Sequence, residues 1–283
     1  MAKIKNYDEL KFTDDFLFGK IMEDSDLCKQ VLECILQTKI GDLEDVVPQK
    51  GFRNTMDGKP IRLDIYTKDS DSVYDVEMQN LNGKSTECRQ LPLRSRFYQS
   101  AIDADLLNKS DSYTELSESN VIFICTFDPF GKNYYMYSFC ERCNEDYEMV
   151  LPSKTNKYFF NAAYKGNDIP DSIKELYEFI QTGNVTGTLT KHIDAAVQSA
   201  KRNEKWRSQY MKERLIYQDY KMEGREEGRE EGREEGLEEG ISIGREEGIS
   251  IGREEGIRIG HEQAEAKIKE LEEELKQIKA GKY

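Results

Sequence analysis

The stretch "RLDIYTKDSDSVYDVEMQN", residues 62–80, contains two short runs in which apolar and polar residues alternate around a polar centre. Alternation with a period of two predicts two strands, and a two-residue loop at Ser70 and Asp71 would join them into a β-hairpin. A slip of one residue would mix apolar with polar partners, so the pattern selects one register, with a bulge or a longer loop as the alternative. The predicted cross-strand pairs are Ile65 with Val76, Asp64 with Glu77, Leu63 with Met78, and Arg62 with Gln79.

The polar face of this hairpin sets two carboxylates opposite each other. Asp64 and Glu77 would have Cβ atoms about 4.5–5.5 Å apart, and like charges at that distance repel each other. A divalent cation between them removes the conflict, and Mg²⁺ commonly takes one or two carboxylates together with waters and phosphate oxygens. The pattern therefore indicates metal-assisted phosphoryl chemistry, in which Gln79 hydrogen-bonds the attacking water or a phosphate oxygen. An acidic, solvent-facing hairpin is the alternative.

Composition limits the classes of chemistry that this chain can perform. Its 283 residues, 37% hydrophobic and 34% charged, allow one sizeable core and a charged appendage. Only two histidines occur, His192 and His261, which disfavours catalysis by histidine and metal sites built from histidine ligands. Six scattered cysteines predict reduced thiols, and Cys140 and Cys143 in "CERC" lack the second pair that a zinc site requires. An active site in this chain should therefore use carboxylates.

Charge and hydropathy exclude some partners. No run approaches the roughly 18 apolar residues of a membrane span, and the first residues lack the apolar core of a secretory signal, so we expect a soluble, cytoplasmic protein without a membrane partner. The net charge is −14, with 12 Lys and Arg against 19 Asp and Glu in residues 221–283, and 29 against 36 in residues 1–220. Each part therefore carries −7, and any contact with phosphates has to come from a local basic patch.

The remaining segments predict an α/β (α+β) domain with a mixed sheet. "SNVIFICTF" (119–127) is a continuous apolar run, which is typical of a strand covered on both faces. "NYYMYSFC" (133–140) and "KYFFNAAY" (157–164) predict further strands, and "MDGKP" (56–60) and "DPFG" (128–131) predict turns. The predicted helices begin at Thr13 or Asp14, run from Ser25 to Gly41, run from near Pro92 to Asn108, begin at Asp171, and run from Leu189 to Tyr220.

The C-terminal tail has a pattern of its own. Ten glycines recur at a strict period of four from Gly224 to Gly260, separated mainly by "REE" and "ISI". If this segment is helical, the glycines cost about 8–10 kcal/mol relative to alanine, and their stripe precesses by roughly 40° per repeat. Two interpretations stay open: a loose helical array that depends on oligomerisation, or a solvated low-complexity tail.

A short coiled coil is expected after this repeat. Spacings of four and three separate its apolar residues, which is the a/d pattern, but only over two to three heptads. So short a segment is marginal alone, and we therefore expect a homo-oligomer, a dimer or larger, formed through the tail. The apolar positions are Ala264, Ile268, Leu271, Leu275 and Ile278.

Six segments follow one another in a characteristic order. They are "TDDFLFGKIMED" (13–24), "RLDIY" (62–66), "VYDVEMQ" (73–79), "LPLRSRFYQSAIDADLL" (91–107), "VIFICTFDPFG" (121–131) and the tail rich in "GREEG". In order and spacing they are similar to the Rpn-type recombination-promoting nucleases, which are also labelled putative transposases of the PD-(D/E)XK nuclease superfamily. The similarity covers about residues 10–220. It implies a restriction-endonuclease-like mixed sheet flanked by helices, Mg²⁺-dependent hydrolysis of DNA, and a role in DNA exchange or defence.

The resemblance also implies roles for single residues. The superfamily pattern D…(D/E)-x-K falls on Asp64 and Glu77 as metal ligands and on Gln79 in place of the lysine. That replacement removes a cation and shifts the stabilisation of charge to the metal and to nearby arginines. The acid of the N-terminal helix is Asp15 or Asp14. The implied domains are residues 1–185 (PD-(D/E)XK-like nuclease), 186–222 (helical extension), 223–260 (glycine repeat) and 261–283 (coiled coil).

Arginines on the helix after the hairpin are candidate ligands of DNA phosphates. Arg89, Arg94 and Arg96 offer bidentate donors that the acidic rest of the chain lacks. Pairing with surface acids is the alternative for these arginines. Tyr98 in the same segment is expected to pack rather than to take part in chemistry.

The sequence thus predicts a DNA endonuclease that uses Mg²⁺, with Mn²⁺ as a substitute, and hydrolyses phosphodiester bonds by a metal-activated water. Its predicted catalytic residues are Asp64, Glu77, Gln79 and Asp15. The alternative is a catalytically degenerate nuclease fold that serves as a binding or assembly module and oligomerises through its tail. The missing lysine at Gln79, the glycine at Gly19 where the family often has lysine, and the negative charge favour this alternative.

Overall fold

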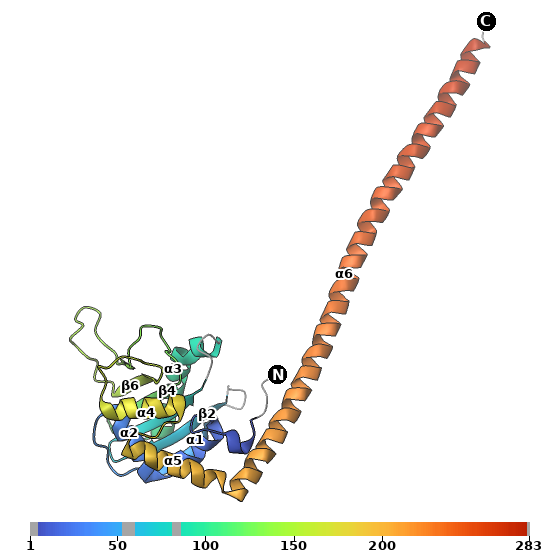
Figure 1. The fold of residues 1–283 in the computed structure, drawn as a ribbon. Helices are drawn as coiled ribbons and strands as arrows, with labels where there is room; N and C mark the ends of the chain where they lie inside the picture. Colours follow the sequence, from blue (N-terminus) through green and yellow to red (C-terminus); the bar gives the residue numbers. More distant parts are fainter. Residues whose placement is uncertain (1–4, 53–59, 81–85, 282–283) are drawn as a thin grey trace. The chain divides into compact units, whose positions relative to one another are not determined.

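The computed structural model describes residues 5–52, 60–80 and 86–281. By packing, the chain divides into two units, Met1–Lys212 and Glu213–Tyr283. The first unit is an α/β domain, and the second consists of helix (Figure 1). No described helix combines the length and the apolar character that a bilayer-spanning segment needs.

A mixed sheet forms the centre of the first unit, with six strands in the described residues. The parallel strands β3, β4 and β6 lie side by side, so their C-terminal residues Gln79, Cys125 and Asn161 lie at the same edge of the sheet. β1, β2 and β5 pair antiparallel with their neighbours. In the order in which they lie in the sheet, the strands are β1 (Glu44–Phe52), β2 (Ile61–Lys68), β3 (Ser72–Gln79), β4 (Glu118–Cys125), β6 (Thr155–Asn161) and β5 (Met136–Phe139).

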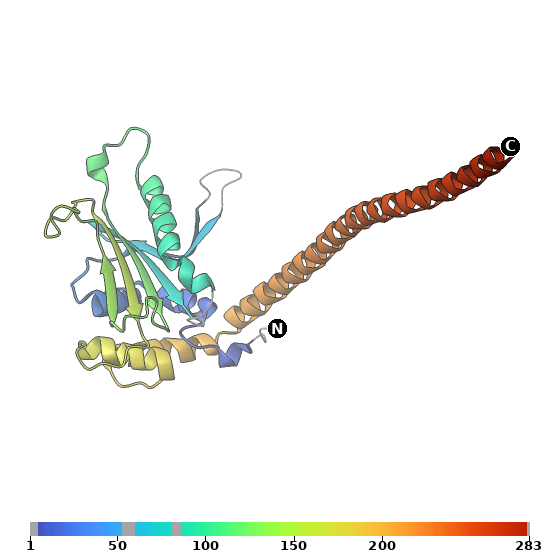
Figure 2. The ribbon, with the colours of Figure 1, turned by 90° about the horizontal axis from the view of Figure 1, so that it is seen from above.

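Helices cover both faces of the sheet, which explains the apolar run of β4 (Figure 2). One face packs under four helices in a core that contains Phe18, Ile65, Val76 and Ile122. The other face packs under the single helix α3. The first four helices are α1 (Asp15–Met22), α2 (Ser25–Leu36), α4 (Asp171–Thr182) and α5 (Thr188–Lys201), and α3 spans Thr86–Leu106. Together these features confirm the predicted mixed sheet flanked by helices.

The hairpin of β2 and β3 has the predicted two-residue loop. Ile65 pairs with Val76 as predicted, and the backbone N–H of Asp69 donates to the carbonyl of Ser72 across the loop at 2.9 Å. The Asp69 carboxylate closes the loop by accepting the N–H groups of Asp71 at 3.0 Å and Ser72 at 2.8 Å. The side chain of Asp69 therefore accepts the loop N–H groups that a backbone carbonyl would accept in an ordinary turn.

Beyond Ile65 the predicted register is wrong, since the regular pairing of β2 with β3 ends at the Ile65–Val76 pair. Leu63 was expected to face Met78, but the two pack in opposite cores, Leu63 under α3 and Met78 under the other helices. The positions at which the pairing ends are those of the two carboxylates. The pairing is interrupted because the side chains of Asp64 and Glu77 accept main-chain N–H groups of the opposite strand.

Several element boundaries also differ from the prediction. α2 ends at Leu36 rather than near Gly41, because Gln37 takes the left-handed conformation that ends the helix. Pro92 lies inside α3, which begins earlier at Thr86. Strand β1 was not predicted at all, since Pro48 and Gly51 interrupt its pattern. The turn predicted at residues 56–60 falls mainly outside the described residues.

The helix predicted from Leu189 to Tyr220 is interrupted. α5 ends at Lys201, and α6 (Glu204–Ala280) begins after Asn203, whose side-chain oxygen accepts the N–H of Trp206 at 3.1 Å. Ile193 and Val197 of α5 are buried in the core, and Tyr210 of α6 packs on Tyr7. The first compact unit accordingly continues to Lys212, although the division of the chain into four domains stays a prediction.

In the second unit the glycine repeat and the terminal heptads are one continuous helix. Every residue from Leu215 to Lys279 is exposed, including Ile268 and Leu275 of the predicted a/d positions. The repeat is therefore helical in the structure, and its dependence on oligomerisation stays a prediction. Its ten glycines add no packing within the chain, because a Cβ atom built on any of them would contact nothing.

We predict that Asp69→Ala lowers the free energy of unfolding by about 1–3 kcal/mol, because two backbone N–H groups of the loop lose their acceptor. Burial alone would raise the pKa of Asp69, but the hydrogen bonds from Asp71, Ser72 and Tyr74 outweigh it, and the pKa is lowered. The contribution of the charged form is thus complete above the unfolded pKa of about 3.9 and is lost as the pH falls through the folded pKa.

Urea unfolding of wild type and Asp69→Asn between pH 7 and pH 2 measures this dependence. The difference in stability between the two proteins should shrink below about pH 4. A difference that stays constant down to the lowest pH would contradict the assignment.

Candidate active site

The two carboxylates of the hairpin lie where the pairing of β2 with β3 stops. The backbone N–H of Asp64 donates to Oε1 of Glu77 at 2.8 Å, and the N–H of Met78 donates to Oδ2 of Asp64 at 3.0 Å. Each acid therefore accepts a main-chain donor of the opposite strand and takes the place of a ladder hydrogen bond. This exchange explains why the regular pairing ends, and it offsets part of the repulsion between the two acids.

Arg94 of α3 donates a hydrogen bond to the second carboxylate oxygen of Glu77. Its Nη2 donates to Oε2 of Glu77 at 3.0 Å, and its Nη1 donates to Oε1 of Gln79 at 2.9 Å. The Nε2 of Gln79 donates to the same Glu77 oxygen at 3.4 Å. Arg94 was predicted as a ligand of DNA phosphate, and the structure brings its guanidinium directly into the acid cluster. Sequence reasoning did not foresee this contact.

Tyr98 holds the guanidinium in place. Its hydroxyl accepts hydrogen bonds from Nε of Arg94 at 3.2 Å and from Nη2 at 2.8 Å. Its ring is stacked on Phe123 of β4, and the Arg94 guanidinium carbon lies 5.2 Å from the centre of the Tyr98 ring. Tyr98 thus packs as expected, and its hydroxyl also belongs to the site. Spacing of four on one helix was the available signal for the Arg94–Tyr98 contact.

A third acid of the cluster, Asp75, was not predicted. It lies two residues before Glu77 on the same face of β3, and it is completely buried. Neither of its carboxylate oxygens has a hydrogen-bond partner among the described residues. The available signal was the alternation of Asp75, Glu77 and Gln79, which the sequence could not tell from an exposed polar face.

An acid of the N-terminal helix also lies near the pair. Asp15 is the first residue of α1, its carboxylate raises the pKa of Asp64, and its Oδ2 lies 3.5 Å from Nη2 of Arg62. Asp14 instead bonds to Lys5 and accepts the N–H of Lys11 at 2.8 Å. Of the two candidates left open by the sequence, Asp15 is therefore the one near the site.

The other two predicted arginines lie away from the acids. Arg89 and Arg96 are exposed, and neither has a hydrogen bond or an ion pair among the described residues. They are seven positions apart on α3 and so share one side of the helix, about 140–160° round from Arg94. The structure thus separates the three arginines into one that contacts the acids and two that face solvent.

The electrostatics of the cluster fit a divalent cation. Burial raises the pKa values of Asp64, Asp75 and Glu77, and a neighbouring carboxylate raises each of them further: Asp15 acts on Asp64, Glu77 acts on Asp75, and Asp64 acts on Glu77. The buried Asp75 and Glu77 and the partly buried Asp64 lie near the guanidinium of Arg94, and the exposed Arg62 is a second cation that acts on Asp64, so the potential negative charges outnumber these two cations once Asp15 is included. The oxygen donors of Asp64 and Glu77 are of the kind that Mg²⁺ prefers. No described group of three His, Cys, Asp or Glu residues is arranged to hold a metal, so waters or substrate would supply the remaining ligands.

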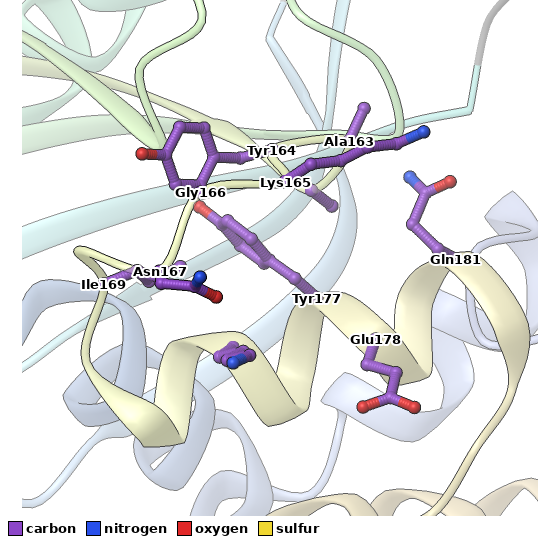
Figure 3. Close-up of a pocket in the computed structure, with 11 residues that line it drawn as sticks. Ala163, Tyr164, Lys165, Gly166, Asn167, Ile169, Tyr177, Glu178 and Gln181 are labelled. Carbon is purple, nitrogen blue, oxygen red and sulfur yellow. The ribbon is translucent and has the colours of Figure 1, made fainter.

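A separate pocket of about 500 Å³ lies beyond the end of β6, between the following loop and α4 (Figure 3). Tyr164 and Lys165 line it from the loop, and Tyr177 and Gln181 line it from α4. None of the predicted site residues lines this pocket. Gln181 does connect it to the same sheet edge, since its Nε2 donates to the carbonyl of Thr126 at 2.8 Å, next to the end of β4.

A mixed sheet flanked by helices, with paired acids on a β-hairpin, is consistent with the PD-(D/E)XK nuclease class. The chain belongs to the PD-(D/E)XK nuclease family transposases, because the sequence model of that family matches residues 12–161, more than half of its length. The match includes Asp15, the β2–β3 hairpin and α3, and it confirms the predicted family. Nucleases of this class typically use divalent metal ions. No curated protein and no solved structure matches the chain significantly.

We predict that Asp75→Asn raises the free energy of unfolding at neutral pH by about 1 kcal/mol or more, because on folding Asp75 has to be buried as a carboxylate without a partner or take up a proton, whereas a neutral amide does neither. Chemical denaturation measures the change. Asp69→Asn is the matched control, since the same substitution there should lower stability. Destabilisation by Asp75→Asn would show that this carboxylate has a favourable partner in the fold.

Proposed function

We propose that this protein is a Mg²⁺-dependent DNA endonuclease that acts in the cytoplasm in recombination, transposition or defence. The observation that carries the proposal is the cluster of two buried acids, Asp75 and Glu77, and the partly buried Asp64 beside the Arg94 guanidinium, near the end of β3 in a chain of a nuclease family. Buried like charges are costly, and a site that binds a cation gives a reason to keep them.

Asp64 and Glu77 would hold the ion. When bound, Mg²⁺ supplies a water of lowered pKa and positive charge beside the scissile phosphate. Two main-chain donors fix the orientation of the two carboxylates, since the N–H of Asp64 on β2 holds Oε1 of Glu77 and the N–H of Met78 on β3 holds Oδ2 of Asp64. Asp15 would act as the additional carboxylate from α1, as the sequence predicted.

Arg94 would supply the cation that Gln79 does not. Its four hydrogen bonds to Glu77, Gln79 and Tyr98 use four of the five N–H groups of a guanidinium and leave one on Nη1 for a phosphate oxygen. The Arg94 side chain is 30% exposed, so a phosphate can reach it. Gln79 would position Arg94 against Glu77, and its second amide N–H remains for the attacking water.

DNA is the proposed partner despite the negative charge of the domain. Arg94 lies at the acids, and Arg89 and Arg96 are free to contact phosphates on the outer side of α3. These contacts would form the local basic patch that an acidic chain needs in order to bind nucleic acid.

We predict that Asp64→Ala and Glu77→Ala each reduce Mg²⁺-dependent nicking of plasmid DNA by at least about 10²-fold. Thermal stability should stay the same or rise for Asp64→Ala, because repulsion between buried acids is relieved. Asp15→Ala should lower nicking, whereas Asp14→Ala, which removes contacts to Lys5 and Lys11 outside the site, should lower stability and leave nicking intact.

Calorimetric titration with Mg²⁺ separates this proposal from a degenerate binding module. The wild-type protein should bind the ion, and Asp64→Ala should bind it more weakly. Undiminished nicking by the purified variants, or absence of Mg²⁺ binding by the wild type, would refute the nuclease assignment.

We also propose that the tail makes the protein a homo-oligomer. The helix of the second unit exposes Leu237, Ile241, Ile268 and Leu275, each by about half or more, and carries ten glycines that disfavour an isolated helix. Burial of these apolar side chains against a second copy would offset the cost of the glycines.

We predict that light scattering finds a dimer or larger assembly for the full chain, and that replacing Ile268, Leu271, Leu275 and Ile278 by Glu shifts it towards the monomer. Circular dichroism should show a loss of helix in parallel, because the helix depends on association. A full-length monomer with unchanged helix content in the variant would contradict the proposal.

A further inference from the structure

The outer side of α3 exposes two large apolar side chains next to two exposed arginines. Leu93 is 61% exposed and Phe97 is 39% exposed. They are four positions apart and therefore neighbours on the helix surface. Arg89 and Arg96 are exposed and form no hydrogen bond or ion pair among the described residues. Apolar exposure on this helix is thus combined with free positive charge.

The four residues form a stripe that begins at the acid cluster. With about 100° per residue, Phe97 lies about 60° round the helix from Arg94, Leu93 about 100°, and Arg89 and Arg96 about 140–160°, all in the same direction. Arg94 is thus at one margin of the exposed surface and Arg89 and Arg96 are at the other. Phe97 and Leu93 lie between them.

Charge distinguishes this stripe from the surface around Tyr147, another exposed aromatic residue. Tyr147 is 72% exposed, but it lies in a segment that also carries Glu145, Asp146 and Glu148. A polyanion would be repelled there and attracted at Arg89 and Arg96. An apolar pair between cations, adjoining a phosphate-processing site, matches a nucleic-acid strand, which presents both phosphates and apolar base faces.

We propose that this stripe, Arg89, Leu93, Arg96 and Phe97, binds a DNA strand whose bases are unpaired, with Phe97 stacking on a base and the arginines on phosphates. The inference rests on the proposed nuclease function and names its substrate class. A strand with one phosphate at the acids and another at Arg96 has to cross Phe97 and Leu93. In a regular duplex the faces of the bases are covered by their neighbours, whereas an unpaired base leaves its face free for Phe97.

The test is the binding of fluorescent oligonucleotides to the full chain in buffer without divalent ions, measured by anisotropy. A single strand, a duplex with a central unpaired bubble, and the perfect duplex of the same sequence are compared. Phe97→Ala should weaken binding of the single strand and of the bubble by about 5- to 100-fold. It should change binding of the perfect duplex by less than twofold.

Matched controls separate stacking from charge. Tyr147→Ala removes an aromatic ring that is more exposed than Phe97 but lies among acids, and it should change nothing. Arg96→Ala should weaken all three ligands alike and reduce their salt dependence, whereas Arg202→Ala, an exposed arginine at the end of α5, should not. Circular dichroism confirms that each variant is folded.

Equal binding of bubble and perfect duplex by the wild type, or no effect of Phe97→Ala, would overturn the inference. A change in oligomeric state on Phe97→Ala would also overturn it, because the face would then be a contact between copies of this chain. Failure of the inference alone leaves nicking sensitive to Asp64→Ala. If the wild type neither nicks nor binds any DNA, the proposed function itself has failed.

Discussion

The burial of like charges at the end of the β2–β3 hairpin is the constraint on which the site depends. Asp64, Asp75 and Glu77 are collected on neighbouring strands of one sheet. Two of them interrupt the ladder and accept main-chain donors instead, while the third has no partner among the described residues. A fold optimised for stability alone would replace such acids by apolar residues. Their presence therefore indicates a function that needs negative charge at a fixed place.

The rest of the domain supplies the rigidity that this arrangement requires. Two apolar cores lie on the two faces of the sheet, and β4 contributes fully buried side chains to both. The parallel order of β3, β4 and β6 brings their ends to one edge, where Asn80 donates to the Thr13 hydroxyl at 3.3 Å and so fixes the start of α1. The unfavourable burial and mutual repulsion of the acids are thus offset by the stability that the two apolar cores give the domain.

Helix α3 links the chemistry of the site to its surface. Its inner side packs on the sheet, Arg94 reaches back to Glu77 and Gln79, and its outer side exposes cations together with apolar groups. The guanidinium stands beside the strand position at which the superfamily has lysine. Positive charge can thus be kept at a site when the residue that supplies it lies on a different element, because only its position in space matters for a phosphate.

The sequence by itself determined the local features: the hairpin and its two-residue loop, the apolar strand β4, the acids at Asp64 and Glu77, and the start of α1. These follow from alternation, capping and turn chemistry over a few residues. Tertiary structure alone decided that β1 joins the sheet, that Asp75 is enclosed on a covered face, that the ladder stops at the acids, and that Arg94 turns inward while Arg89 and Arg96 remain outside. The physical reason is that burial and the choice of hydrogen-bond partner depend on contacts between segments far apart in the chain. The pattern of neighbouring residues does not specify these contacts.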